Sequence, residues 1–156
     1  VHALYKSSLF MIAGGIDHEA GTRDTRRLSG LFKFMPLTAA ASFLAAMSMM
    51  GVPPAIGFIA KELIYEAKLH ATLFPWLLAG IAWFANSVNV AIAVFAGVRP
   101  FIGKAKDELH AHEGAWGLWA APMVTAAAGL LLGVFPRLLG KMIISPAVSG
   151  IAAEEE

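Results

Sequence analysis

Long apolar stretches, separated by short polar loops, make up most of this chain. A helix needs about 20 consecutive apolar residues to cross the hydrocarbon core of a bilayer, and stretches of about that length recur along the sequence. The chain is 58% hydrophobic and 15% charged. A soluble domain holds roughly 45–50% apolar and about 25% charged residues. The pattern therefore predicts an all-α membrane protein, a bundle of helices that cross the bilayer.

The apolar pattern divides the chain into two parts. Residues 1–135 are expected to form transmembrane helices, and residues 136–156 an interfacial helix followed by an acidic tail. The expected spans are a partial helix at 1–16, a long segment with a break at 34–70, and helices at 74–98 and 115–135.

The first expected span is too short to cross a bilayer. From Lys6 to Ile16 a helix rises about 15 Å, which is half of a hydrocarbon core about 30 Å thick. If Asp17 marks the membrane surface, Lys6 lies near the midplane. A free amino terminus at Val1 would be costly at that depth, so we expect the native protein to have residues before Val1.

Lysine and arginine placement predicts the topology. The positive-inside rule assigns the more basic loops to the cytoplasm, and loops 17–33 and 99–114 are the more basic ones. These two loops hold Arg23, Arg26, Arg27, Lys33, Arg99, Lys104 and Lys106, whereas the opposite side holds Lys68, Arg137 and Lys141.

The segment 34–70 contains two adjacent prolines, Pro53 and Pro54, flanked by Gly51 and Gly57. Proline lacks a backbone N–H group and clashes with the preceding helical turn, and glycine relaxes the chain. Because apolar sequence continues on both sides, the pattern predicts a discontinuous helix with irregular backbone at membrane depth. Transporters use such breaks to build ion sites. The alternatives are a simple proline kink and a tight turn between two short helices.

Four ionisable residues are the candidate proton and ion pathway: Lys61 and its neighbour Glu62 just after the break, and His2 and Lys6 in the first span. His2 and Lys6 are four residues apart, which puts them on one helix face. Ionisable groups inside membrane spans are rare and mark ion or proton pathways by default. The alternative for a lysine is that its stem reaches the interface. We expect that alternative for Lys68 and Lys141.

Other polar residues receive simpler interpretations. Asn86 and Asn89 are expected to form hydrogen bonds between helices, with a hydrated path as the alternative. The stretch 17–19 is expected to pair with Arg23, Arg26 or Arg27. His110, His112 and Glu113 are expected to lie in a solvated loop. A metal site is the alternative, but no second cluster of ligands completes a coordination shell.

The sequence contains no pattern typical of an enzyme active site. It has no cysteine, no phosphate-binding glycine loop, no nucleophile elbow and no metalloprotease helix. Its net charge is +1, which gives no reason to expect nucleic acid as a partner. No catalytic residue, cofactor or resident metal is therefore expected.

Several motifs resemble one family. Residues 2–6, HALYK, resemble the HAxxK element of the antiporter-like subunits shared by respiratory complex I and Mrp-type Na⁺/H⁺ antiporters. Residues 51–62 resemble the broken helix of that family with its lysine. Residues 17–31, and ISPA at 144–147, are most similar to the large A subunit of the Mrp-type antiporters.

The resemblance implies a fold of about fourteen helices with two inverted repeats, of which this chain is the end of the second repeat and the final helix. It implies that Lys6 belongs to a central proton relay with His2 as its companion, and that Lys61 is the terminal lysine of the path. The implied partners are the other subunits of a hetero-oligomeric Mrp complex, the lipid bilayer, protons and Na⁺, in a bacterial inner membrane.

Three functions remain open at this stage. The first is a subunit of a cation/proton antiporter that exchanges protons for Na⁺ and is not itself an enzyme. The second is the distal proton-pumping subunit of NADH:quinone oxidoreductase. The third is a structural membrane subunit that has kept its charges only for packing. The sequence leaves open whether this segment carries H⁺ or Na⁺.

Overall fold

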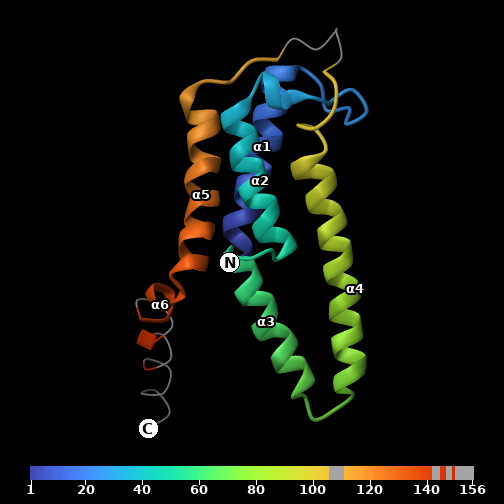
Figure 1. Cartoon of the computed structure of the whole chain (residues 1–156), viewed down its shortest axis with the longest axis vertical. Coiled ribbons are helices and arrows are strands. Elements are labelled where there is room, and N and C mark those ends of the chain that lie inside the picture. The colour runs from blue at the N-terminus through green and yellow to red at the C-terminus, as the bar shows by residue number, and fades with distance from the viewer. Residues whose placement is uncertain (106–110, 142–144, 147–148, 150–156) are drawn as a thin grey trace.

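The computed structural model describes residues 1–105, 111–141, 145–146 and 149, and this part of the chain is helical with no β-strand. The all-α prediction is confirmed (Figure 1). The interfacial helix expected after residue 136 is described only in part, and the acidic tail at 154–156 lies outside the described residues. The elements are α1 (His2–Ala20), the 3₁₀ turn η1 (Leu31–Lys33), α2 (Pro36–Met50), α3 (Ile56–Leu69), α4 (Pro75–Ala93), the π-helical turn η2 (Val94–Val98), α5 (Trp116–Val134) and α6 (Pro136–Leu139).

Proline and glycine set several of the helix boundaries. Prolines stand in the first turn of α2, α4 and α6, where the missing N–H would have no helical partner anyway. Gly21 and Gly51 end α1 and α2 in the left-handed region, with φ of 64° and 78°, which glycine adopts without a steric penalty. As a result α1 runs through 17–19, a stretch that the sequence pattern assigned to a loop.

Among the residues that the structure describes, two helices are long and apolar enough to cross a membrane. They are residues 75–98, with 24 residues and a mean hydropathy of 1.8, and α5, with 19 residues and a mean hydropathy of 1.7. By contrast, α2 has 15 residues and α3 has 14, so each rises only about 21–23 Å. These two helices are the halves of the expected broken segment. The non-helical backbone between them covers residues 51–55, and the Pro53–Pro54 bond is cis.

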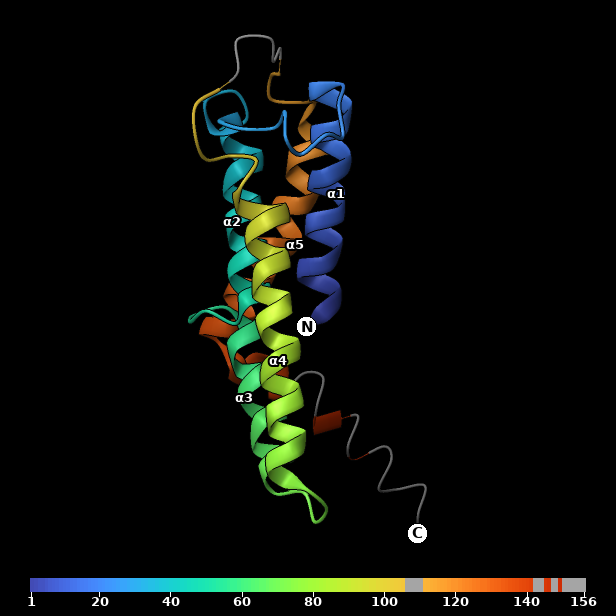
Figure 2. The same ribbon diagram turned by 90° about the vertical axis from the view of Figure 1, so that its right-hand side faces the viewer.

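The loops 21–35 and 99–115 lie together at one end of the bundle, here called the loop end. The Gly30 and Leu31 N–H groups donate to the Ile102 and Pro100 carbonyls, both at 3.2 Å. The α3–α4 connection lies at the opposite end, here called the hairpin end (Figure 1). Val1 lies between the two ends, near the break between α2 and α3 (Figures 1 and 2).

The core lies between α1, α2 and α5 on the loop-end side of the break. Its buried side chains include Ile12, Leu31, Met35 and Phe101. Buried serines join the helices through backbone carbonyls: Ser8 Oγ donates to Pro122 O at 2.8 Å, and Ser42 Oγ donates to Gly97 O at 2.7 Å. Small and hydroxyl residues at helix contacts are typical of membrane bundles.

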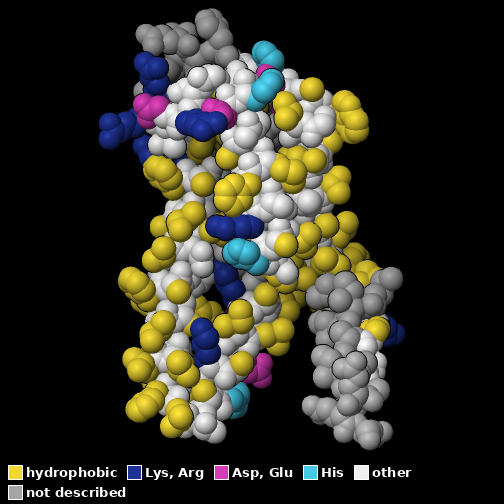
Figure 3. All heavy atoms as spheres, turned by 180° about the vertical axis from the view of Figure 1, so that it is seen from behind, with side chains coloured by type: hydrophobic (Ala, Val, Ile, Leu, Met, Phe, Trp, Pro, Cys, Tyr) yellow, Lys and Arg dark blue, Asp and Glu magenta, His cyan; other side chains and the backbone are white. Residues whose placement is uncertain are grey.

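The outer surface is largely apolar. On α4, Trp76 is 82% exposed and Trp83 is 68% exposed. Figure 3 shows hydrophobic side chains along most of one face, with several charged side chains at the loop end. It also shows a column of Lys or Arg and His side chains along the middle of this face, and acidic and His side chains near the opposite end. An exposed apolar surface of this extent fits contact with lipid or with further protein.

The start of α2 is capped by a residue from a distant loop. The Glu113 carboxylate accepts the Leu37 and Thr38 N–H groups at 2.8 and 3.2 Å, and the Thr38 hydroxyl at 2.5 Å. A carboxylate at a helix N-terminus satisfies unpaired donors and complements the helix dipole.

We expect Glu113→Ala to destabilise this end of α2 by about 1 kcal/mol, the usual cost of losing a cap. Amide hydrogen exchange at Leu37 and Thr38 should become several-fold faster, since about 1.4 kcal/mol is a tenfold change. Glu66→Ala, at an exposed position on α3, is the control. Unchanged exchange at Leu37 in Glu113→Ala would show that the cap does not stabilise the helix.

Candidate functional site

The break between α2 and α3 makes the carbonyl of Met49 available to a side-chain hydrogen-bond donor. The Gly51 and Val52 N–H groups donate to Met47 O at 3.1 and 3.0 Å, closing the end of α2. Met49 O instead accepts the Lys61 Nζ at 2.6 Å. An ammonium group at a helix C-terminus meets the negative end of the helix dipole. The end of α2 therefore supplies an acceptor for the Lys61 ammonium.

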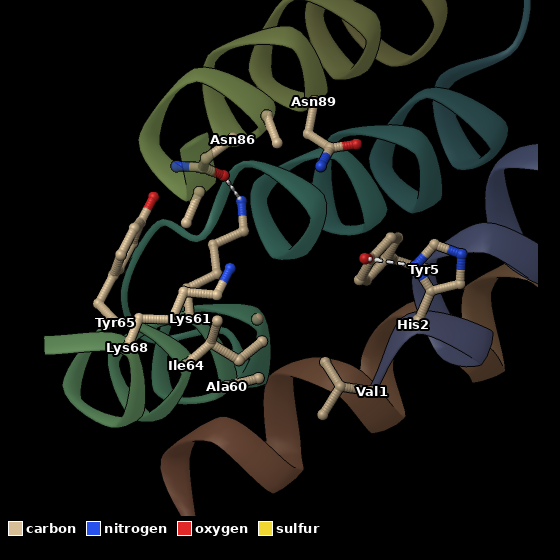
Figure 4. A pocket seen from close by; sticks show the side chains of 13 residues that line it. Val1, His2, Tyr5, Ala60, Lys61, Ile64, Tyr65, Lys68, Asn86 and Asn89 are labelled. Carbon is tan, nitrogen blue, oxygen red and sulfur yellow. Dashed lines mark hydrogen bonds between the residues drawn. The ribbon is translucent and has the colours of Figure 1, made fainter. Parts of the chain in front are cut away.

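Lys61 also reaches across to α4. Its ammonium donates to the Asn86 Oδ1, so one side chain from α3 joins the end of α2 to the middle of α4 (Figure 4). The Lys61 side chain is half-buried. An asparagine amide carries both an acceptor oxygen and a donor nitrogen, so Asn86 has a suitable group for either the charged or the neutral lysine.

Glycines allow this close approach. A Cβ on Gly51 would lie 2.6 Å from Lys61 Cδ, in the space that the lysine stem occupies. A Cβ on Gly57 would lie 1.7 Å from Ser48 O, where α3 crosses the end of α2. From α5, a Cβ on Gly133 would lie 2.1 Å from Pro54 O. The glycines and prolines of the predicted break thus fix the position of Lys61.

A cavity of about 300 Å³ opens beside Lys61, between α3, α4 and the first turns of α1. Its polar side chains come from all three helices (Figure 4), and among the described residues that line it none carries a carboxylate. The lining residues are Val1, His2, Tyr5, Gly57, Ala60, Lys61, Ile64, Tyr65, Lys68, Ala82, Ala85, Asn86 and Asn89.

The structure brings two of the four predicted pathway residues to this cavity, His2 and Lys61. His2 Nδ1 lies 2.8 Å from the Tyr5 hydroxyl, and the two rings meet edge-on with centroids 5.1 Å apart. His2 therefore contacts Tyr5 through both a hydrogen bond and ring packing. Tyr5 is a site residue that the sequence interpretation missed.

Lys6 and Glu62 do not line the cavity. The Lys6 ammonium lies 5.7 Å from the centroid of the Phe10 ring, which is itself 70% exposed. Glu62 is exposed on α3. Within the described part of the chain, the hydrogen-bond partners of Lys61 are a carbonyl and an amide, and neither Lys6 nor Glu62 is among them.

Two further cavity residues, Tyr65 and Lys68, follow Lys61 at positions i+4 and i+7. Such residues lie on one helix face, so this spacing was the available sequence signal for them. Lys68 is half-buried beside the cavity, whereas the sequence pattern favoured a side chain that reaches the interface. Met49 contributes through its backbone carbonyl, and no sequence signal marks that role.

The remaining candidates lie at the loop end. Asp17 pairs with Arg23 at 2.7 Å, which is one of the expected loop ion pairs. The Glu19 carboxylate contacts His18 and His112 at 3.0 and 2.9 Å. Glu113 caps α2, and His110 lies outside the described residues. These groups are remote from Lys61 along the bundle axis.

Comparison with known proteins gives consistent results. Residues 1–86 match the family model described as NADH:quinone oxidoreductase/Mrp antiporter, TM. The chain is 37% identical to the A subunit of the Na⁺/H⁺ antiporter from Alkalihalophilus pseudofirmus and 35% identical to that from Bacillus subtilis. Both alignments cover 96% of the present chain. It spans only 20% of the length of these relatives.

The fold is also similar to a solved structure. A chain of the Mrp complex from Dietzia sp. matches with a TM-score of 0.79 and 23% identity, over 88% of this chain and 34% of the other. The family match covers more than half of the sequence and includes the break and Lys61. The chain therefore belongs to the transmembrane family shared by NADH:quinone oxidoreductases and Mrp antiporters.

Proposed function

We propose that this chain is part of one protein of a multi-subunit cation/proton antiporter, in which Lys61 carries protons that are exchanged for Na⁺. The observation that carries the proposal is the position of the Lys61 ammonium, between the Met49 carbonyl and the Asn86 amide, beside a cavity at the break. A lysine changes its protonation state readily when it is buried, unlike an arginine. Its surroundings offer hydrogen-bond partners for both states.

The cycle at Lys61 has two states. In the charged state the ammonium donates to Met49 O and Asn86 Oδ1. In the neutral state the amine nitrogen becomes an acceptor, and rotation of the Asn86 amide presents a donor to it. His2, on the α1 side of the same cavity, is the proposed proton donor to Lys61. By the family resemblance, Lys6 belongs to the central proton relay and His2 is its companion.

The face of α1 that bears Lys6 and Phe10 is proposed to be covered by the remainder of the protein. It is costly for a charged lysine to face lipid, and the relatives are about five times longer than this chain, which spans 20% of their length. Glu62 is proposed to act at the exposed side of α3, where another part of the protein approaches. The activity therefore belongs to the whole protein.

The antiporter assignment follows the names of the relatives, which are Na⁺/H⁺ antiporter subunits. We propose that the chain lies in a bacterial cell membrane, with loops 17–33 and 99–114 in the cytoplasm, among the other subunits of an Mrp complex. The chain is then a transporter segment with no catalytic centre of its own. The pumping subunit of NADH:quinone oxidoreductase is the second candidate, because the family model covers both kinds of protein.

One preparation separates the candidates. The complex purified through this protein is reconstituted into vesicles, a Na⁺ gradient is imposed, and internal pH is followed with a dye. We expect Na⁺-dependent pH change and co-purification of small antiporter subunits. Flavin and iron–sulfur partners with NADH-driven quinone reduction would support the second candidate. Undiminished exchange in vesicles that lack this protein would reduce it to a scaffold and contradict the proposal.

A further inference from the structure

The cavity beside Lys61 extends along α3 toward the hairpin end. Lys61, Tyr65 and Lys68 line it from successive turns of α3 (Figure 4). Seven residues separate the two lysines, a rise of about 10 Å along the helix. Lys68 stands in the last turn of α3, which ends at Leu69. The cavity therefore runs from the break along α3 as far as Lys68.

We propose that Tyr65 and Lys68 form the route by which a proton passes between Lys61 and the hairpin end of the bundle. This inference rests on the proposed role of Lys61 and adds the next two residues of the path. Lys68 suits the position because its stem is half-buried at the cavity while its backbone lies one residue from the helix end. A long lysine side chain at such a place can reach both the cavity and the surface.

Proton transfer between the two lysines conserves both protons and charge. The Lys61 ammonium gives its proton to a water molecule in the cavity and becomes a neutral amine. The neutral Lys68 amine takes a proton from that water and becomes an ammonium, which then releases a proton to water at the hairpin end. The Tyr65 hydroxyl lines the same cavity and can hydrogen-bond to the transferring water, because a hydroxyl both accepts and donates.

The ionisable groups that face the cavity favour transfer of one proton at a time between Lys61 and Lys68. Its titratable groups are Lys61, Lys68 and Tyr65 from α3, with His2 and Tyr5 from α1, while α4 adds only the amides of Asn86 and Asn89. Like charges that share a site disfavour the state in which both are ionised. In the proposed route, arrival of a proton on Lys61 is followed by release of a proton from Lys68.

No ion pair or hydrogen bond holds the Lys68 ammonium within the part of the chain that the structure describes, in contrast to Lys61 with its two partners. The Lys68 side chain is therefore not held at one position by such a partner, and its length allows it to meet water in the cavity and at the hairpin end. A lysine kept only for packing or solubility would have no need to line the cavity.

The transport test uses Lys68→Met and Lys68→Arg in the intact complex, with subunit content checked by gel. Both should slow Na⁺-dependent proton exchange at least about tenfold, since a methionine carries no proton and an arginine does not release one. Lys68→His should restore part of the exchange with an optimum moved to lower pH, because histidine titrates near 6.5. The matched controls, Lys33→Met and Lys33→Arg, change an exposed lysine at the loop end and should leave exchange unchanged.

An accessibility test does not depend on transport. In a complex without other reactive thiols, Tyr65→Cys and Lys68→Cys should react with a membrane-impermeant thiol reagent added at the hairpin end. Leu63→Cys, on the exposed apolar side of α3, should not. Absence of labelling at both cavity positions, or normal exchange by Lys68→Met and Lys68→Arg, would overturn this route. Normal exchange by Lys61→Ala would instead overturn the proposed function, whatever the labelling shows.

Discussion

Lys61→Ala is expected to abolish Na⁺-dependent proton exchange by the assembled complex. The variant removes the group that joins the end of α2 to Asn86 and leaves Met49 O without its side-chain donor. A positioned proton carrier contributes about 10²–10⁴-fold to a proton-transfer step, so the residual exchange should be close to background. The measurement is the pH change in vesicles that carry the intact complex.

The control for Lys61→Ala is Lys33→Ala, which removes an exposed lysine of η1. Subunit content should be unchanged in both variants if Lys61 serves transport rather than packing. Normal exchange by Lys61→Ala would remove this lysine from the path. Loss of the protein from the complex would instead point to a structural role for the contact with Met49.

Gly51→Ala is expected to impair exchange although no ionisable group is changed. At a φ of 78° any residue with a side chain is strained by about 1–2 kcal/mol. The added methyl would also lie 2.6 Å from Lys61 Cδ, so the lysine stem must move away from Met49 and Asn86. A displacement of about 1 Å can cost a reaction about 100-fold, and we expect a loss of that order.

Gly80→Ala is the matched control, because a Cβ at that position of α4 meets nothing within 4 Å. It should exchange at the wild-type rate. If Gly51→Ala exchanged equally well with normal subunit content, the close fit between the break and Lys61 would not matter for transport.

Much of the architecture was predictable from local chemistry. The prolines and glycines of the segment 34–70 predicted the break, because two adjacent prolines cannot continue a helix, and the structure has non-helical backbone at 51–55. The all-α class followed from the apolar stretches. Lys61 was singled out because it is an ionisable residue just beyond that break, and its role in transport stays a prediction.

The contacts of Lys61 were not predictable, because they depend on how distant helices pack. Met49 takes part through a backbone carbonyl that is freed only by the way α2 ends at Gly51. Asn86 was expected to join helices, and its partner became known only from the structure. The extent of α1 was missed for a local reason: the charged residues 17–19 read as a loop, but the helix continues to the glycine that ends it.

The contacts made by the loops were not predictable from the sequence either. Glu113 caps a helix that begins more than 70 residues earlier in the chain, and nothing in its local sequence marks that role. Lys68 carried a periodic signal, since it shares a helix face with Lys61, but a lysine near a helix end is also typical of a side chain that reaches the membrane surface. The structure adds that Lys68 lines the cavity beside Lys61.

The central claim is that Lys61 works by gaining and losing a proton, and Lys61→Arg tests it most directly. Arginine keeps a positive charge and hydrogen-bond donors at the end of α2, but it stays protonated at every working pH. The measurement is Na⁺-dependent pH change in vesicles with intact complex, compared with wild type across the pH range. The account predicts severe impairment at every pH with normal subunit content, and exchange at the wild-type rate by the arginine variant would contradict it.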